Sequence, residues 1–201
     1  MINAAYNIDK RSYAPLHNKA IHHIDLSTCT DAHIRLSFEG QALFGLRREE
    51  SMKFTLSEAL QGNTINIMPS WTKGGIGRVL DITTPAQRKW LNKIAQLVKP
   101  GESLIPSDRT YRQQLSHYQA QTAQMGLSKI HGLRHAYAQR RYRELTTEFD
   151  RHKIGLISPI EGGKLYKDMT AYEKALDRKA RQIISRLLGH SRINIVKIYL
   201  G

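Results

Sequence analysis

The spacing of apolar and polar residues along the chain predicts a protein built mostly of helices. From about Lys19 to Phe54 the apolar positions recur at helical intervals, and Phe38, Ala42, Leu43 and Leu46 lie on one face. The same periodicity predicts helices over about 84–100, 111–126, 132–149 and 170–189. A short last helix is expected to carry residues 193, 196 and 199.

Two of these predicted helices begin with recognisable capping signals. Thr84 and Gln87 have the spacing of a capping box, and Pro85 stands at the first helical position between them. Thr170 and Glu173 have the same spacing ahead of a long apolar stripe. These signals fix where the two helices begin.

A second pattern, alternation of polar and apolar residues, predicts a small sheet. Residues 64–68 and 78–82 alternate polar and apolar, and Gly74 and Gly75 supply a turn between them. The two runs are therefore expected to pair as a β-hairpin with Lys73 close to its tip. Residues 150–169 contain one proline and a Gly-Gly pair, which favours a long loop. The predicted fold class is α+β, mainly helical with a small antiparallel sheet.

Charge narrows the choice of partner. The chain has 201 residues, with 31 Lys and Arg against 17 Asp and Glu, which gives a net charge of +14. An excess this large favours a polyanion, and double-stranded DNA is the first candidate because neutralised phosphates release counterions. An anionic membrane ranks lower, because no basic cluster stands beside an apolar anchor and no run of 18 apolar residues occurs. The single cysteine, Cys29, excludes an internal disulfide and a cysteine-based zinc site, and residues 1–19 have no apolar core of a signal peptide. We expect a cytoplasmic protein.

Two places combine positive charge with a means of orienting it. Arg47 and Glu50 are three residues apart, so a carboxylate could hold the guanidinium ready to grip a phosphate. His131 and Arg134 have the same spacing at the start of a predicted helix, where the helix dipole also favours an anion. Taken singly, a solvated helix end and a structural histidine are the commoner explanations.

Two further places carry isolated reactive groups. Lys73 at a hairpin tip is usually solubilising, yet it is well placed to reach into a DNA groove. His190 follows a glycine at a predicted helix end, and Tyr199 stands nine residues later. Such residues are normally a cap and a core side chain, so each signal is weak alone.

The order of these residues resembles the catalytic domain of the tyrosine recombinase (phage integrase) family. The resemblance covers about residues 20–200 and rests on four boxes, which are Gly45-Leu46-Arg47 with Glu50, Thr72-Lys73-Gly74-Gly75-Ile76-Gly77-Arg78-Val79, His131-Gly132-Leu133-Arg134-His135, and Leu187-Leu188-Gly189-His190-Ser191 with Tyr199. It implies the tyrosine recombinase catalytic-domain fold. It also implies that the family's catalytic residues are those in the list Arg47, Lys73, His131, Arg134, His190 and the nucleophile Tyr199. Arg48 competes with Arg47, and the spacing to Glu50 favours Arg47.

The implied chemistry is strand cleavage and rejoining at a specific DNA site. The arginines would clamp the phosphate oxygens, Lys73 would protonate the leaving 5′ oxygen, His131 would act as acid or base, and His190 would donate to a phosphate oxygen. The product would be a 3′-phosphotyrosyl link with a free 5′-hydroxyl. No ATP, other cofactor or metal is then expected, and the sequence has neither a phosphate-binding Gly loop nor an acidic cluster for two metals. The resemblance further implies a bacterial, DNA-associated enzyme of a mobile genetic element, assembled as a homotetramer on DNA, with a monomer as the alternative in isolation.

The expected domain organisation is an arm or linker at residues 1–19 and a catalytic domain at 20–201. His190 follows Arg134 by 56 positions, which is long for the family and predicts an insertion at about 144–179. Two residues follow Tyr199, and residues 1–19 are too few for the family's usual DNA-clamping domain. The chain is therefore expected to be a catalytic fragment or a naturally short enzyme.

Three other functions stay open. A type IB topoisomerase-like enzyme would use the same chemistry without strand exchange. A DNA-binding protein of the same fold without catalysis would have no need of Tyr199. A metal nuclease ranks last, because the one suggestive pair, His22-His23, would point apart on the expected helix.

Overall fold

The computed structural model describes residues 15 and 17–201, so most of the predicted arm lies outside the described residues. Within the described part, the helices and strands are α1 (Ala32–Phe44), α2 (Arg48–Met52), α3 (Leu56–Ala59), β1 (Leu60–Gln61), β2 (Thr64–Ile67), β3 (Arg78–Asp81), α4 (Pro85–Leu97), α5 (Tyr111–Gln124), α6 (Gly132–Phe149), α7 (Ala171–Leu187) and α8 (Lys197–Leu200). Short 3₁₀ turns stand between them at η2 (Pro69–Trp71), η3 (Pro159–Glu161), η4 (Tyr166–Asp168) and η5 (Ile193–Val196). The predicted α+β, mainly helical fold class is confirmed.

The helices predicted after residue 84 are confirmed, and local hydrogen bonds explain where two of them begin. At the start of α4, Thr84 Oγ1 accepts from the backbone N–H of Gln87, and Gln87 Oε1 accepts from the backbone N–H of Thr84. Thr170 and Glu173 make the same reciprocal pair at α7. These bonds satisfy backbone donors that a helix start otherwise leaves unpaired.

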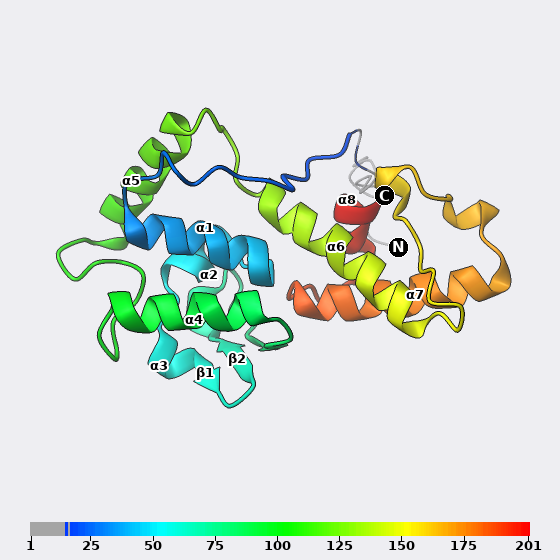
Figure 1. Cartoon of the computed structure of the whole chain (residues 1–201), viewed down its shortest axis with the longest axis horizontal. Coiled ribbons are helices and arrows are strands. Elements are labelled where there is room, and N and C mark those ends of the chain that lie inside the picture. Colours follow the sequence, from blue (N-terminus) through cyan, green and yellow to red (C-terminus); the bar gives the residue numbers. More distant parts are fainter. Residues whose placement is uncertain (1–14, 16) are drawn as a thin grey trace, which may run out of the picture.

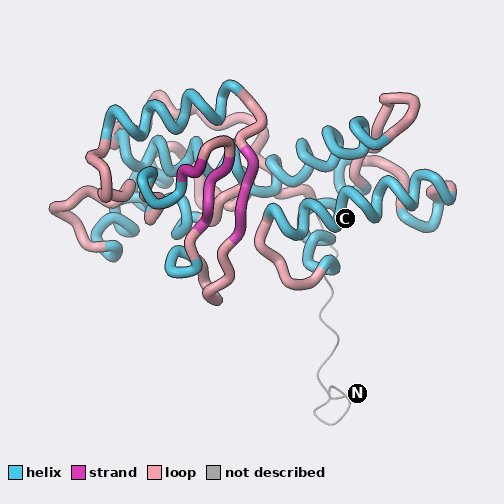
Figure 2. The backbone as a smooth tube through the Cα atoms, turned by 90° about the horizontal axis from the view of Figure 1, so that it is seen from below, coloured by secondary structure: helices cyan, strands magenta, loops and turns pink. Residues whose placement is uncertain are grey.

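The predicted hairpin is also confirmed, with one extra strand. β2 and β3 pair antiparallel in the register Thr64↔Asp81 to Ile67↔Arg78, and β1 adds to the other edge of β2. Figure 2 shows the three strands side by side in front of the helices. Ile65, Ile67 and Leu80 are buried toward the core, as their alternation predicts. Lys73 lies in the connection between η2 and β3.

The helix expected from about Lys19 to Phe54 is wrong in two places. Residues 17–31 form an irregular strap, whose Ile21 N–H donates to the carbonyl of Gly132 at 2.9 Å. Its apolar residues pack against a core shared with α1 and α5, so they meet the burial requirement without a helix. Gly45 then separates α1 from α2, because its φ of 63° is left-handed and a Cβ there would stand 2.4 Å from the ring of Tyr137.

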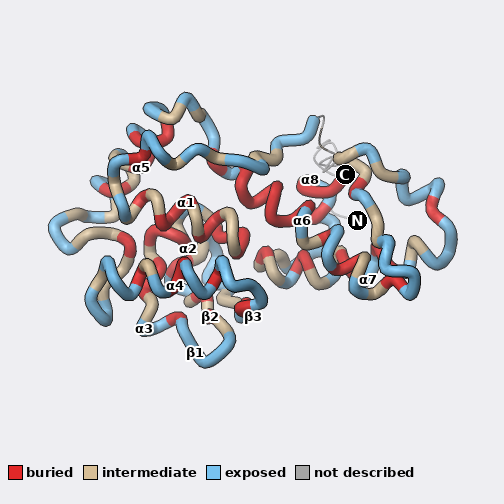
Figure 3. Tube along the Cα trace, in the orientation of Figure 1, coloured by how far each residue is buried: buried red, intermediate tan, exposed pale blue. Residues whose placement is uncertain are grey.

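Helix α6 joins the two halves of the molecule (Figure 1). On one side α1, α4 and the sheet enclose an apolar core that includes Phe44, Phe54 and Trp90. On the other side α6 packs against α7, η5 and α8 around Tyr142, Ile184 and other apolar residues. Figure 3 shows that the first half of α6 is buried between them. Residues on this half of α6 therefore contact both groups of elements.

The loop expected at 150–169 is confirmed, since α6 continues to Phe149 and α7 begins at Ala171 with only η3 and η4 between them. The predicted insertion at about 144–179 includes this loop and the flanking helix ends. That boundary, and the division at residue 20, stay predictions.

Candidate active site

Arg134 occupies the centre of the predicted site. Its side chain is fully buried on the first turn of α6. The guanidinium donates to the carbonyls of Gly45 and Leu188, and its Nε donates to the hydroxyl of Tyr199 at 3.3 Å. Burial, the largest effect, lowers the pKa of Arg134 to about 10, so the group stays cationic at neutral pH. One side chain thus connects the α1–α2 turn, the end of α7 and α8.

Glu50 is the buried anion beside this centre. Its carboxylate accepts from Arg47 Nη1 at 2.6 Å and from two nitrogens of Arg78 at 2.7 and 2.9 Å. Burial raises the pKa of Glu50, but the bonds and charge of Arg78 outweigh it and hold that pKa at about 2. Arg47, where α2 begins, also reaches the carbonyl of Gly189 at 3.3 Å. Three guanidinium groups gather near one carboxylate, so the site keeps a net positive charge.

Three imidazoles surround the ring of Tyr199. The ring centroids of His135, His190 and His131 lie 4.6, 5.7 and 6.1 Å from that of Tyr199. Burial and then the charge of Arg134 lower the pKa of His190 to about 3. The same two effects lower the pKa of His131, which is exposed to the cleft and so screened by water. Both rings are neutral at pH 7, and a bound phosphate anion would raise their pKa values.

Lys73 stands at the rim of the site. It is exposed and lines a cleft of about 530 Å³ together with Arg47, Arg48 and His131. Among the described residues its ammonium group makes no hydrogen bond or ion pair. A cleft lined by several cations and by the imidazole of His131 is suited to binding a phosphate diester.

The structure brings the six predicted site residues to one region. Lys73 belongs to this region because it lines the same cleft as Arg47 and His131. Arg47 is the arginine that engages Glu50, whereas Arg48 is exposed and lines the cleft. Sequence reasoning missed Arg78, whose Nε also donates to the carbonyl of Leu187 at 2.7 Å. Arg78 is 28 positions from Glu50, so no local spacing signals the pair.

Sequence reasoning also missed the buried neighbours of Tyr199. His135 stands in the quoted box and packs on the ring, and Gln139 Nε2 donates to the backbone carbonyl of Tyr199 at 3.1 Å. The only available signal was their helical spacing after His131, which is also the spacing of ordinary core positions.

A family model described as Integrase matches residues 8–140 of this chain. The chain belongs to the integrase family. The matched range includes Arg47, Lys73, His131 and Arg134, whereas His190 and Tyr199 lie beyond it. This integrase therefore belongs with proteins of DNA integration and recombination, and its partner is DNA.

No curated protein and no solved structure matches the integrase. In the part of the chain that the structure describes, no helix is both long and apolar enough to cross a bilayer. Within residues 17–201, no three His, Cys, Asp or Glu side chains gather in the manner of a metal site.

Proposed function

We propose that this integrase is a tyrosine site-specific recombinase, with Tyr199 as its nucleophile. The hydroxyl of Tyr199 attacks the phosphorus of a DNA phosphodiester, and the bond from phosphorus to the 5′ oxygen breaks. The phenol loses its proton, and the leaving 5′ oxygen gains one. A 3′-phosphotyrosyl link then conserves the energy of the diester, so a 5′-hydroxyl can reverse the reaction and rejoin strands without ATP.

The contact between Arg134 and the phenol of Tyr199 carries this proposal. A guanidinium has five N–H groups, and in this structure those of Arg134 reach Gly45, Leu188 and Tyr199. A phosphate attacked by Tyr199 would therefore lie beside a buried cation, where developing charge is stabilised most strongly. Arg47 would supply the second guanidinium, held by Glu50.

The remaining residues would move protons. His131 is neutral and faces the cleft, so it can take the proton of the phenol. Lys73 on the hairpin connection can protonate the 5′ oxygen, and His190 can donate to a phosphate oxygen. Tyr199 is only 4% exposed, so neighbouring side chains enclose its ring before DNA enters the cleft.

Covalent trapping tests the proposal. The integrase is incubated with nicked duplexes of randomised sequence, in EDTA, and run on a denaturing gel; DNA recovered from the adduct is then sequenced. We expect a protein–DNA band that Tyr199→Phe abolishes and that Tyr166→Phe, a change at an exposed tyrosine, retains. An adduct formed by Tyr199→Phe would refute the assigned nucleophile, and loss of the wild-type adduct in EDTA would refute a metal-independent reaction.

Two further readouts separate the rival functions. Relaxation of supercoiled DNA without any strand exchange would favour a type IB topoisomerase-like enzyme. DNA binding without an adduct on any enriched sequence would favour a binding protein that lacks catalysis.

Removal of the buried guanidinium in Arg134→Ala is expected to slow adduct formation at least 100-fold, which corresponds to about 3 kcal/mol of transition-state stabilisation.

A further inference from the structure

Helix α6 presents a row of residues toward α8. His131, His135 and Gln139 stand at intervals of four, so they lie one above another on the same helix face. α6 packs along α8, which carries Tyr199. Residues of this row therefore lie beside both the side chain and the backbone of Tyr199.

His135 supports the ring of Tyr199. It is 4% exposed, and its ring lies 4.6 Å from that of Tyr199 with the two planes tilted by 46°. None of the hydrogen bonds among the described residues involves the His135 ring. Burial also lowers the pKa of His135 to about 4, which keeps the ring uncharged at neutral pH. In this setting His135 is an aromatic surface rather than a donor or a charge.

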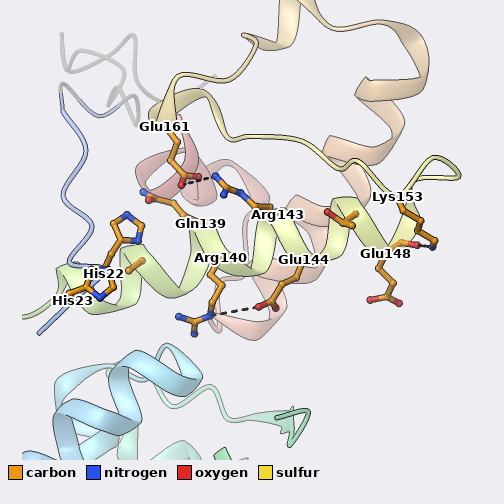
Figure 4. Close-up of a pocket in the computed structure, with 11 residues that line it drawn as sticks. His22, His23, Gln139, Arg140, Arg143, Glu144, Glu148, Lys153 and Glu161 are labelled. Carbon is orange, nitrogen blue, oxygen red and sulfur yellow. Dashed lines mark hydrogen bonds and ion pairs between the residues drawn. The ribbon is translucent and has the colours of Figure 1, made fainter. Parts of the chain in front are cut away.

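Gln139 holds the backbone of the same residue. It is 1% exposed, and its Nε2 donates to the carbonyl of Tyr199 at 3.1 Å and to Asn18 Oδ1 at 2.8 Å. Asn18 Nδ2 in turn donates to Gln139 Oε1 at 3.4 Å, so the two amides bind each other at both ends. Asn18 belongs to the irregular strap before α1. Figure 4 shows Gln139 on α6 close to the strap residues His22 and His23, at one end of a cavity of about 750 Å³.

Helix α8 needs such support because it is a single turn. One helical turn is not stable by itself, so the position of α8 depends on its packing against α6, η5 and η3. In-line attack on phosphorus tolerates little error, and a displacement of about 1 Å at a reacting atom can cost about 100-fold in rate. A contact to the ring and a contact to the carbonyl together fix both the side chain and the backbone of Tyr199.

We propose that His135 and Gln139 are positioning residues for Tyr199, and that Asn18 extends this hold to the strap before α1. The inference rests on the proposed function, in which Tyr199 is the nucleophile. The new element is that α6 orients the nucleophile and that the strap before α1 contacts one of the orienting residues, Gln139. A change in the strap would therefore alter the reactivity of a tyrosine far along the chain.

The first test uses single-turnover adduct formation at saturating DNA, with the enriched nicked duplex. His135→Leu removes the aromatic surface, and we expect a 10- to 100-fold slower adduct with an unchanged DNA Kd. His135→Phe restores an aromatic ring without imidazole nitrogens and is expected to return the rate to within about threefold of wild type. If His135→Phe is as slow as His135→Leu and the pH profile changes, His135 transfers protons and the proposal is wrong.

The second test concerns the amide link. Gln139→Met keeps the length of the side chain but removes its hydrogen bonds, and we expect a rate loss of about 10-fold or more. Asn18→Leu is expected to act in the same direction, and the double variant to be no slower than Gln139→Met alone, because both act through one link. Gln121→Met is the matched control, since Gln121 is equally buried and bonds Thr30 instead. A Gln139→Met protein that loses thermal stability as Gln121→Met does, with an unchanged rate, would overturn the role.

A readout without DNA separates this inference from the proposed function. Hydrogen exchange of the 193–201 segment is expected to be faster in Gln139→Met and in Asn18→Leu than in wild type or Gln121→Met. Unchanged exchange would overturn the inference even if Tyr199 is the nucleophile. Failure of the proposed function would appear instead as a missing wild-type adduct or as an adduct in Tyr199→Phe.

Discussion

The buried carboxylate of Glu50 gives the sharpest quantitative prediction. Glu50 is fully buried and binds both Arg47 and Arg78. Its pKa is held at about 2, compared with 4.5 in an unstructured chain. Since one pKa unit corresponds to about 1.4 kcal/mol, ionisation of this group contributes about 3 kcal/mol to the free energy of unfolding at neutral pH.

The sign of the pH dependence follows from the lowered pKa. The contribution is complete above pH 4.5 and is lost as the pH falls through 4.5 toward 2, because the unfolded chain takes up the proton first. At pH 3 about 1.4 kcal/mol of it remains. Glu50→Gln removes the titrating group, so its difference in stability from wild type is expected to shrink by about 2 kcal/mol between pH 7 and pH 3.

Urea unfolding at the two pH values measures this difference. Glu49→Gln is the matched control, because Glu49 is partly exposed and pairs with Lys53 on the surface. Its cost is expected to stay below about 1 kcal/mol at pH 7. A Glu50→Gln deficit that is equal at both pH values would refute the reasoning, because the carboxylate would then have no lowered pKa in the folded protein.

Three further predictions concern the elements that hold the site. Gly45→Ala is expected to destabilise the protein by at least about 1 kcal/mol, seen as a lower melting temperature, because the new Cβ would meet the Tyr137 ring at a left-handed φ. Thr170→Ala removes the oxygen that accepts from the Glu173 N–H at the start of α7; urea unfolding is expected to show a loss of about 1 kcal/mol, and a neutral result would mean that this cap contributes nothing. His135→Phe is expected to lessen acid sensitivity between pH 6.5 and 4, because the lowered pKa of His135 makes the unfolded chain take up a proton that the folded protein excludes. Unfolding curves of this variant and of wild type that fall in parallel over that interval would contradict the last prediction.

The sequence by itself determined the elements whose signals are local. The capping boxes at Thr84 and Thr170 and the alternation of β2 and β3 predict the observed structure because each depends on residues a few positions apart. The same holds for the chemical character of the site. Arginines, histidines and a tyrosine in a fixed order indicate phosphate chemistry before any contact is known.

Tertiary structure alone decided which residues hold that site together. Residues 17–31 have apolar positions compatible with a helix, yet packing of the strap on α6 and the adjoining core covers most of them only in part and needs no helix. Arg78 meets Glu50 across 28 positions, and Gln139 meets the Tyr199 carbonyl across 60. A buried polar group requires a hydrogen-bond partner. Which partner it finds depends on the polar groups that are buried beside it when α6 joins the two halves of the molecule. Periodicity records only that a position is buried, so it could not distinguish His135 and Gln139 from ordinary core residues.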